Sequence, residues 1–134
     1  MSKRNNFSYR VYYEDTDAGG VVYYANYLKF FERARSDFLR SLDISQSDLA
    51  TKENLIFVVR KCAIEYFSPA KLDDEINVDV MVKEVRAASI VMEQKIRKSG
   101  KILSCLNVEI VSVAADNFKP KKIPENLKSL FDVR

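Results

Sequence analysis

Residues 12–42 read YYEDTDAGGVVYYANYLKFFERARSDFLRSL, and the second half of this stretch decides the fold. From Tyr27 to Phe38, apolar side chains recur at intervals of three and four residues, with charged side chains between them. This spacing predicts one long amphipathic helix that runs from Tyr27 to about Leu42. Because an isolated helix of this length is marginal in water, its apolar face must pack against another part of the chain.

The segments around this helix have the period of two that is typical of strands. Residues 7–13 precede it and are rich in aromatic and β-branched side chains. Ser99-Gly100 separates the last two segments and has the composition of a two-residue hairpin turn. The four segments that follow the helix are residues 55–67, 75–86, 88–98 and 101–113.

The order of the elements is therefore a strand, the long helix, four strands and a short closing helix. Residues 45–54 are expected to hold one more helical turn, and residues 117–134 a short basic linker and a C-terminal helix that begins at Pro124. Strands segregated from helices favour the α+β class, with a five-stranded antiparallel sheet wrapped around one long helix. At 134 residues, the chain is expected to be a single domain, residues 1–134.

The strands also predict self-association. In residues 55–67, apolar side chains occupy both alternation sets, with Val58 and Cys62 in one and Phe57 and Val59 in the other. One helix cannot bury both faces of a sheet, and an open sheet has two unpaired edges. We therefore expect an obligate homo-oligomer.

Composition excludes several classes of protein. The chain has 22 basic and 19 acidic residues, a net charge of +3, which is too mild for a dedicated nucleic-acid binder. No stretch approaches the roughly 18 apolar residues of a membrane span, and the start MSKRNNFSYR lacks the apolar core of a signal peptide. We expect a soluble cytoplasmic protein, for which a small polyanionic ligand remains open.

The two cysteines lie inside apolar alternating segments. We expect Cys62 and Cys105 to be reduced core residues of an intracellular protein. The alternative, a catalytic thiolate, is disfavoured because the chain contains no histidine that could activate one.

The absence of histidine also excludes Ser-His-Asp triads, Cys-His dyads and the usual zinc sites. Carboxylates are then the natural general bases. Glu14, Asp15 and Asp17 stand at the end of the first strand, where alternation sends Asp15 and Asp17 to the same side. One of these carboxylates is a candidate base or nucleophile.

Gly19 and Gly20 follow at once, and they carry no side chain that would block a ligand's approach to the backbone. If the helix begins between Tyr23 and Asn26, its unpaired N–H groups and positive dipole end lie near these carboxylates. A carboxylate that faces fixed N–H donors is a minimal site for acyl transfer, because the donors hold the developing oxyanion. The alternative is an acidic turn that only caps the helix.

The lack of an evident general acid favours one kind of acyl compound. An amide needs protonation of a poor leaving group, whereas a thiol, with a pKa of about 8.5, leaves readily. A carboxylate site without histidine therefore fits hydrolysis of a thioester better than hydrolysis of a peptide.

Residues 11–35, VYYEDTDAGGVVYYANYLKFFERAR, closely resemble the signature of the 4-hydroxybenzoyl-CoA thioesterase family, and within it the bacterial YbgC-like acyl-CoA thioesterases. The resemblance covers roughly residues 7–131, and the run EDTDAGGVVY is a specific signal. It implies the hotdog fold, in which a curved antiparallel sheet wraps a long helix. It also implies hydrolysis of acyl-CoA to free acid and CoA, with CoA as part of the substrate and with no separate cofactor or metal.

The resemblance assigns roles residue by residue. Asp17 matches the family's catalytic carboxylate, which acts as nucleophile or as base toward water. The backbone N–H of Tyr24 matches the oxyanion donor, and Gly20 gives the turn room. Because active sites of the family lie at a dimer interface, Val59 and Arg60 are expected to line the partner's pocket. The oligomer is expected to be a dimer of dimers, a homotetramer.

Two positions raise questions about the family's usual pattern. YbgC-like members usually have histidine where this chain has Tyr24, so only the main-chain N–H can serve there. Arg86 stands at the turn where family members often place basic residues for the CoA phosphates, with Lys119, Lys121 and Lys122 as further candidates. The lysines can equally be solvated surface charge.

Glu32 also has two interpretations. The aromatic-acyl branch of the family has an acidic residue there, near the substrate ring. The alternative is an ordinary ion pair with Arg33 or Arg35.

A second function stays open beside the thioesterase. The chain can be a non-catalytic module that binds acyl-CoA or acyl carrier protein and is linked to lipid metabolism or the cell envelope. A hotdog hydratase is disfavoured, because those enzymes typically use an Asp/His pair and this chain has no histidine.

Overall fold

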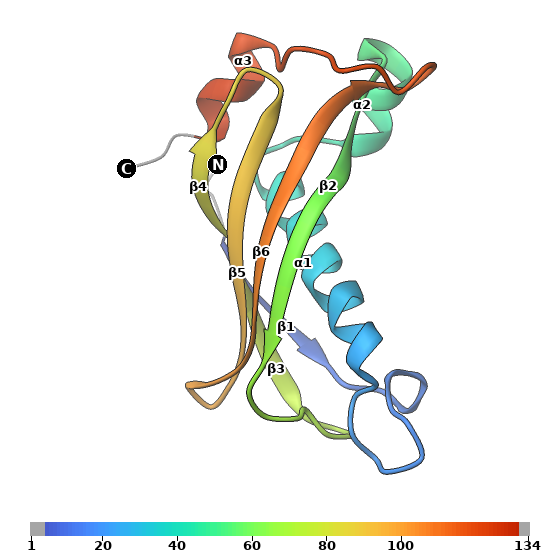
Figure 1. The fold of residues 1–134 in the computed structure, drawn as a ribbon, viewed down its shortest axis with the longest axis vertical. Coiled ribbons are helices and arrows are strands. Elements are labelled where there is room, and N and C mark those ends of the chain that lie inside the picture. The colour runs from blue at the N-terminus through green and yellow to red at the C-terminus, as the bar shows by residue number, and fades with distance from the viewer. Residues whose placement is uncertain (1–4, 132–134) are drawn as a thin grey trace.

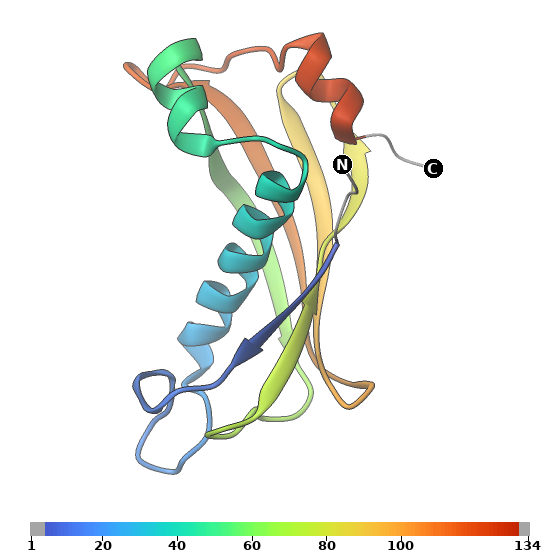
Figure 2. The ribbon, with the colours of Figure 1, turned by 180° about the vertical axis from the view of Figure 1, so that it is seen from behind.

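An antiparallel sheet curves around helix α1, Tyr27–Ser41, which crosses the concave face (Figures 1 and 2). The computed structural model describes residues 5–131, so both ends of the predicted domain, residues 1–4 and 132–134, lie outside the described residues. The predicted α+β class and the hotdog arrangement are confirmed.

The strand order of the sheet is β1-β3-β5-β6-β2, and β4 pairs with β5 beside this path. Every pairing is antiparallel. Within the described residues, β2 therefore stands at one edge of the sheet and β1 at the other. The strands are β1 Asn6–Arg10, β2 Leu55–Tyr66, β3 Glu75–Asp79, β4 Met81–Val85, β5 Ser89–Lys98 and β6 Lys101–Ala114.

The segment predicted as one strand, residues 75–86, is divided at Val80 into β3 and β4. The Asp79 carboxylate accepts the Lys95 N–H at 2.9 Å and so takes the place of a backbone acceptor of the ladder. Val80 N–H donates instead to the Asn5 carbonyl at 2.8 Å. The described chain thus has six strands where five were expected, because this one is interrupted by a side chain that alternation does not reveal.

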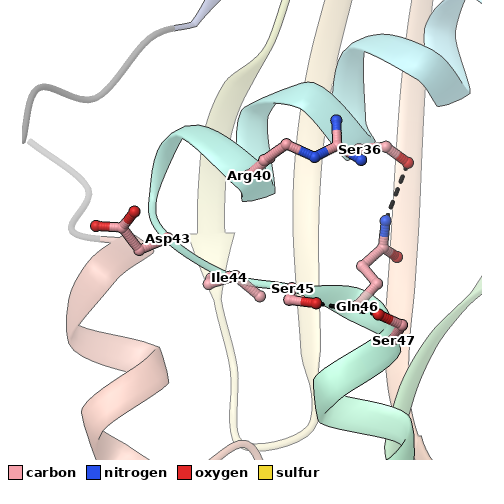
Figure 3. Close-up of a pocket in the computed structure, with 7 residues that line it drawn as sticks. All are labelled: Ser36, Arg40, Asp43, Ile44, Ser45, Gln46 and Ser47. Carbon is pink, nitrogen blue, oxygen red and sulfur yellow. Dashed lines mark hydrogen bonds between the residues drawn. The ribbon is translucent and has the colours of Figure 1, made fainter.

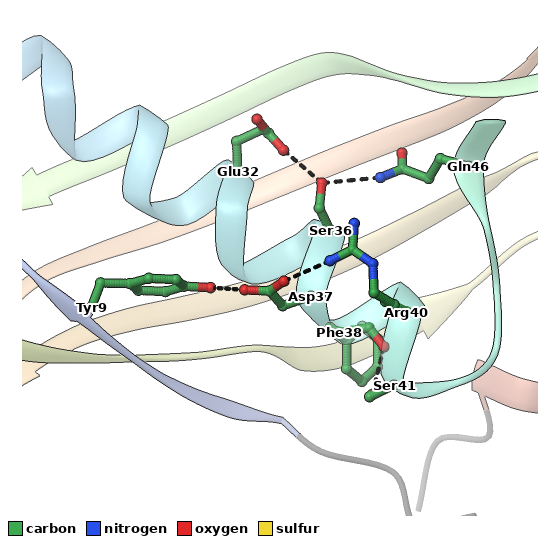
Figure 4. Close-up of polar contacts among 8 residues, drawn as sticks. All are labelled: Tyr9, Glu32, Ser36, Asp37, Phe38, Arg40, Ser41 and Gln46. Carbon is green, nitrogen blue, oxygen red and sulfur yellow. Dashed lines mark hydrogen bonds and ion pairs between the residues drawn. The ribbon is translucent and has the colours of Figure 1, made fainter.

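The predicted long helix is confirmed with nearly the predicted ends. Burial of one large apolar side chain is worth ~1.5–3 kcal/mol, so the contact between α1 and the sheet is a major source of stability. Figure 4 shows a polar tie on the flank of α1, where Asp37 accepts from the Tyr9 hydroxyl of β1 and from Arg40. The buried face consists of Tyr27, Phe30, Phe31, Ala34, Phe38 and Leu39.

The remaining helices and turns lie close to their expected positions. Helix α2, Gln46–Glu53, is longer than the single turn that was expected, and its C-cap, Asn54, adopts the left-handed conformation (φ 51°). Helix α3, Glu125–Lys128, follows Pro124, and a 3-10 turn, Ser129–Phe131, buries Phe131 under α1. None of the helices in residues 5–131 has the length and apolar character needed to cross a membrane.

The predicted hairpin turn at Ser99-Gly100 joins β5 to β6. Both residues have positive φ, 50° and 82°. A two-residue turn of this kind matches the twist of the strands that it joins.

Strand β2 corrects the prediction for the cysteines. Its middle, residues 59–63, is exposed, and Cys62 lies within it, while Cys105 on β6 is half-buried. The prediction that both are core residues is wrong. Alternation along a strand gives its period, but it does not say which strand stands at the edge of the sheet without a neighbour.

Candidate active site

Between β1 and α1 the chain makes two 3-10 turns, Tyr13–Asp15 and Tyr24–Asn26, with a tight loop between them. In this loop, Asp17 N–H donates to the Val21 carbonyl at 2.9 Å, and Gly20 N–H donates to the Asp17 carbonyl at 3.1 Å. The loop lies at the end of the molecule where α1 begins, at the bottom of Figure 2. The carboxylate of Asp17 and the first amides of the helix therefore share one end of the fold.

The two glycines of the loop have different roles. Gly20 has φ +78°, a conformation that other residues rarely adopt, and a Cβ there would meet nothing within 4 Å. Gly20 is therefore needed for its backbone conformation. The expectation that it gives the turn room is not supported, because a Cβ would fit. A Cβ on Gly19 would come 3.3 Å from Asp17 Oδ1, so Gly19 leaves space for the carboxylate.

Asp17 and Asp15 do not lie on the same side, and this prediction is wrong. Asp17 is exposed, and its Oδ1 accepts the Gly19 N–H at 2.8 Å. Asp15 is buried, and its Oδ2 accepts the Tyr12 N–H at 2.9 Å. The reason is that Asp15 ends a 3-10 turn and not a strand, so alternation does not apply. Asp15 holds the loop together, which leaves Asp17 as the accessible carboxylate.

The start of the helix is fixed by a residue that sequence reasoning missed. Tyr24 N–H occupies the first position of its 3-10 turn, where an N–H has no partner within the helix. The Tyr24 carbonyl accepts the Tyr27 N–H and also the Tyr66 hydroxyl, the latter at 3.0 Å. Donors from α1 and β2 thus fix the Tyr24–Ala25 peptide, which directly follows the peptide that carries the Tyr24 N–H. The only sequence signal for Tyr66 was an aromatic residue at the end of a long strand.

Aromatic rings pack around the same turn. Tyr66 meets Tyr27 edge-on at 5.2 Å between centroids and Tyr24 at 6.3 Å. Tyr27 is buried, and its hydroxyl accepts the Ala70 N–H at 2.9 Å. Burial raises the pKa of Tyr27 and of Tyr66 above the ordinary tyrosine value. Both hydroxyls therefore stay protonated at neutral pH, and Tyr66 keeps the proton that it donates.

The loop between β2 and β3, residues 67–74, is hydrogen-bonded to the Asp17 loop, and we call this contact the brace. Leu72 N–H donates to the Gly20 carbonyl at 3.1 Å. Asp74 holds this brace, since its carboxylate accepts the Lys71 N–H at 2.9 Å and pairs with Lys98 Nζ at 2.7 Å. Desolvation acts to raise the pKa of Asp74, but Lys98 and Lys71 outweigh it and leave the pKa below its ordinary value.

The residues expected to line the partner's pocket lie far from Asp17 in their own chain. Val59 and Arg60 are exposed in the middle of β2, and Arg60 is the extra residue of a β-bulge between Val59 and Lys61. Tyr66, which does reach Tyr24, lies seven residues further along. At about 3.3 Å per residue, Val59 is roughly 23 Å from that contact.

Arg86 lies at the opposite end of the molecule from the Asp17 loop, at the turn between β4 and β5 (Figure 1). Its guanidinium pairs with Glu84 at 2.6 Å and with Glu109 at 2.9 Å. The hydrogen bond with Glu84 raises the pKa of Arg86, and the same bond lowers the pKa of Glu84. Among the tail lysines, Lys121 donates to the backbone carbonyls at the end of α2.

The surface of residues 5–131 has, among others, three depressions that Asp17 does not line. Figure 3 shows a polar one of about 390 Å³ between the end of α1 and α2, lined by Ser36, Arg40 and Gln46 among others. A second, of about 240 Å³, lies between α1 and the sheet. The third, of about 430 Å³, lies by the β5–β6 hairpin. Residues 5–131 contain no cluster of acidic and thiol side chains placed to bind a metal.

The family model described as the thioesterase-like superfamily matches residues 11–131. The chain belongs to the thioesterase-like superfamily. The match includes the Asp17 loop, α1 and the whole of β2.

Relatives within the thioesterase-like superfamily confirm the resemblance to YbgC-like members. The chain is 46% identical over 129 residues to the acyl-CoA thioesterase YbgC of Haemophilus influenzae, covering 95% of each protein. It is 42% identical over 123 residues to the acyl-CoA thioester hydrolase YbgC of Escherichia coli, covering 91% of each. A solved probable thioesterase from Bartonella henselae superimposes with a TM-score of 0.85 and 38% identity, covering 89% of this chain and 98% of that one.

Asp74→Asn tests whether the brace depends on charge. The folded-state pKa of Asp74 lies below the ordinary value of about 3.9 for an aspartate. The ionised carboxylate therefore stabilises the fold fully above pH ~3.9, and this stabilisation is lost as the pH falls through the folded-state pKa. At pH 7 the variant should lose roughly 1–2 kcal/mol of unfolding free energy in denaturant titrations, and less at pH 3. Asp73→Asn, at an exposed neighbour, is the control. An equal loss at both pH values would contradict the assignment.

Proposed function

We propose that this chain hydrolyses the thioester of acyl-CoA to a free carboxylic acid and CoA. The observation that carries the proposal is the accessible carboxylate of Asp17, fixed by Gly19 N–H at the end of the fold where α1 exposes its first amides. The names of the two YbgC relatives at 46% and 42% identity support this activity.

The chemistry needs one carboxylate and one oxyanion donor. In the base route, a water oxygen attacks the carbonyl carbon while Asp17 takes the water's proton. In the nucleophile route, a carboxylate oxygen of Asp17 attacks, and water then hydrolyses the resulting anhydride. In both routes the Tyr24 N–H donates to the oxyanion, the C–S bond breaks, and the departing thiolate takes up a proton to become CoA.

Histidine is not required by either route. The thiol group has a pKa of about 8.5 and leaves readily without a dedicated acid. The Tyr24 side chain is exposed and packs beside Tyr23, at 4.9 Å between ring centroids. Its main-chain N–H is therefore the group assigned a role in catalysis.

We assign the second half of each site to a partner subunit. A bare edge strand of 12 residues with an exposed centre is a template for pairing with another strand. Exposed aromatic residues around the Asp17 loop make a patch that a second copy would cover. A homodimer through β2 brings Val59 and Arg60 to the partner's loop, and a dimer of dimers is the proposed full assembly. The exposed aromatic residues are Tyr12, Tyr13, Tyr23, Tyr24, Tyr66 and Phe67.

Binding of the CoA phosphates falls to exposed cations. All three nitrogen atoms of the Arg86 guanidinium donate to Glu84 or Glu109, so the charge of Arg86 is already compensated by carboxylates. Lys119 and Lys122 are exposed, and we assign the phosphates to these two in place of Arg86. Acyl carrier protein is an alternative carrier of the acyl group, and no separate cofactor is proposed.

Asp17→Asn is expected to lower kcat for acyl-CoA hydrolysis by ~10²–10⁴-fold, because the amide can neither attack nor take a proton. Release of CoA with a thiol reagent, over a panel of acyl chain lengths, measures it. Glu14→Gln, at an exposed neighbour, should retain activity. Unchanged turnover with Asp17→Asn would remove Asp17 from the mechanism. Tight binding of acyl-CoA without any turnover by the unmodified chain would favour the non-catalytic module.

Tyr66→Phe is expected to lower kcat about 3–10-fold and to leave KM within twofold, since the lost hydrogen bond holds the Tyr24–Ala25 peptide, which directly follows the amide whose N–H serves the transition state. Tyr66 is a positioning residue. Tyr13→Phe, at an exposed tyrosine of the same patch, is the matched control. A rise in KM with kcat unchanged would instead indicate a role in substrate binding.

Mixing of variants tests the shared site. Asp17→Asn and Val59→Glu each damage a different half, so each alone should have low activity. Hybrid oligomers contain one site with both halves intact, and activity should reappear on mixing under conditions of subunit exchange. Sedimentation shows whether each variant still assembles. If two assembling variants exchange subunits without any recovery, both halves belong to one chain.

A further inference from the structure

The cavity of about 240 Å³ between α1 and the sheet is one of the surface depressions described above, and it is lined by five apolar and four polar side chains. Side chains of β2, β5, β6 and α1 form it, and Gln46 of α2 closes one side. Its volume equals that of about eight water molecules at ~30 Å³ each. The apolar lining consists of Leu39, Phe57, Val59, Met92 and Ile110.

Three of the polar residues at the cavity are hydrogen-bonded to one another. Figure 4 shows the chain of hydrogen bonds, in which Gln46 Nε2 donates to Ser36 Oγ at 3.0 Å and Ser36 Oγ donates to Glu32 Oε2 at 2.6 Å. Glu32 thus contacts a serine, and neither of the ion pairs expected for it, with Arg33 or Arg35, is among the salt bridges of residues 5–131.

Arg35 is the remaining polar side chain at the cavity. Its Nη1 donates to Gln94 Oε1 at 2.9 Å, and Gln94, which is fully buried, donates to the Phe31 carbonyl at 2.9 Å. The guanidinium is therefore held in a fixed place. Burial lowers the pKa of Arg35, and the negative charge of Glu32 acts in the opposite direction.

Arg35 differs from the other fixed arginines by its lack of a carboxylate partner. Arg10, Arg40, Arg86 and Arg97 each form an ion pair within 4 Å, whereas Arg35 forms none with the residues described. A cation withdrawn from water is costly unless an anion or hydrogen-bond acceptor compensates it. The planar guanidinium matches a carboxylate with two parallel N–H donors.

We propose that this cavity binds the acyl part of the substrate and that Arg35 selects acyl groups that end in a carboxylate. The inference rests on the proposed function. A cavity of this size suits a short ω-carboxyacyl chain of about five or six carbons, with its methylene groups against the apolar wall and its terminal carboxylate on Arg35.

The acyl chain reaches the cavity from the partner's catalytic loop. Within one chain, Tyr24 and Arg35 are eleven residues apart, which is about 16 Å along the helix axis and too far for a short acyl group. Val59 lines the cavity of its own chain, and the proposed function places it beside the partner's Asp17. The acyl chain of the substrate therefore passes Val59 on its way from the partner's Asp17 to Arg35.

Matched pairs of substrates test the inference. For the unmodified protein, kcat/KM for glutaryl-CoA should exceed that for pentanoyl-CoA, which has the same chain length, by at least about tenfold, the effect of ~1.4 kcal/mol. Arg35→Met should abolish or reverse this ratio. Arg33→Met changes an arginine of the same helix that lies over the Phe30 ring, and it should keep the ratio. Arg35→Lys should keep part of it.

Each outcome decides one claim. Hydrolysis of pentanoyl-CoA at least as fast as glutaryl-CoA by the unmodified protein overturns the role of Arg35 and leaves the thioesterase standing. Equal losses on both substrates in Arg35→Met and Arg35→Lys mean that Arg35 only supports Gln94, which also overturns it. If neither substrate is hydrolysed but other members of the acyl-CoA panel are, the role of Arg35 is overturned and the thioesterase stands. If no member of the panel is hydrolysed, the proposed function fails, and calorimetric binding of glutaryl-CoA against pentanoyl-CoA still tests the cavity.

Discussion

The packing of α1 into the concave face of the sheet is the constraint on which the rest of the structure depends. Phe30, Phe31 and Phe38 are completely buried in this contact, and the sheet curves around the helix (Figure 2). Because the helix axis is fixed by this packing, its first turn is fixed too. The Asp17 loop and the opening amides of α1 meet at one end of the molecule as a result.

In the proposed site, main-chain geometry takes the place of a histidine. The loop around Asp17 is held by Gly19 and Gly20, while Asp15 is buried as an acceptor of backbone N–H groups. Tyr66, from the far end of β2, holds the Tyr24 carbonyl. A site built from one carboxylate and one amide needs this rigidity, because neither group can compensate for a misplaced partner.

The arginines differ in how their charge is compensated. Arg97 and Arg86 are neutralised by carboxylates of the sheet, so they stabilise the fold and offer little to a ligand. Arg35 is fixed by an amide and not by a charge. Position along the sequence could not distinguish these cases, since Arg33, Arg35 and Arg86 all stand within two residues of an acidic residue in the chain.

The sequence by itself determined the period of each element, the long helix, the hairpin at Ser99-Gly100 and the family motif around Asp17. These follow from local spacing, backbone preference and a contiguous run of letters. Only the tertiary structure decided that Asp15 is buried, that Cys62 is exposed at a bare edge, that Tyr66 reaches Tyr24, and that Arg35 lacks a carboxylate. Burial and partnership depend on contacts between residues distant in sequence, and local periodicity carries no record of those contacts.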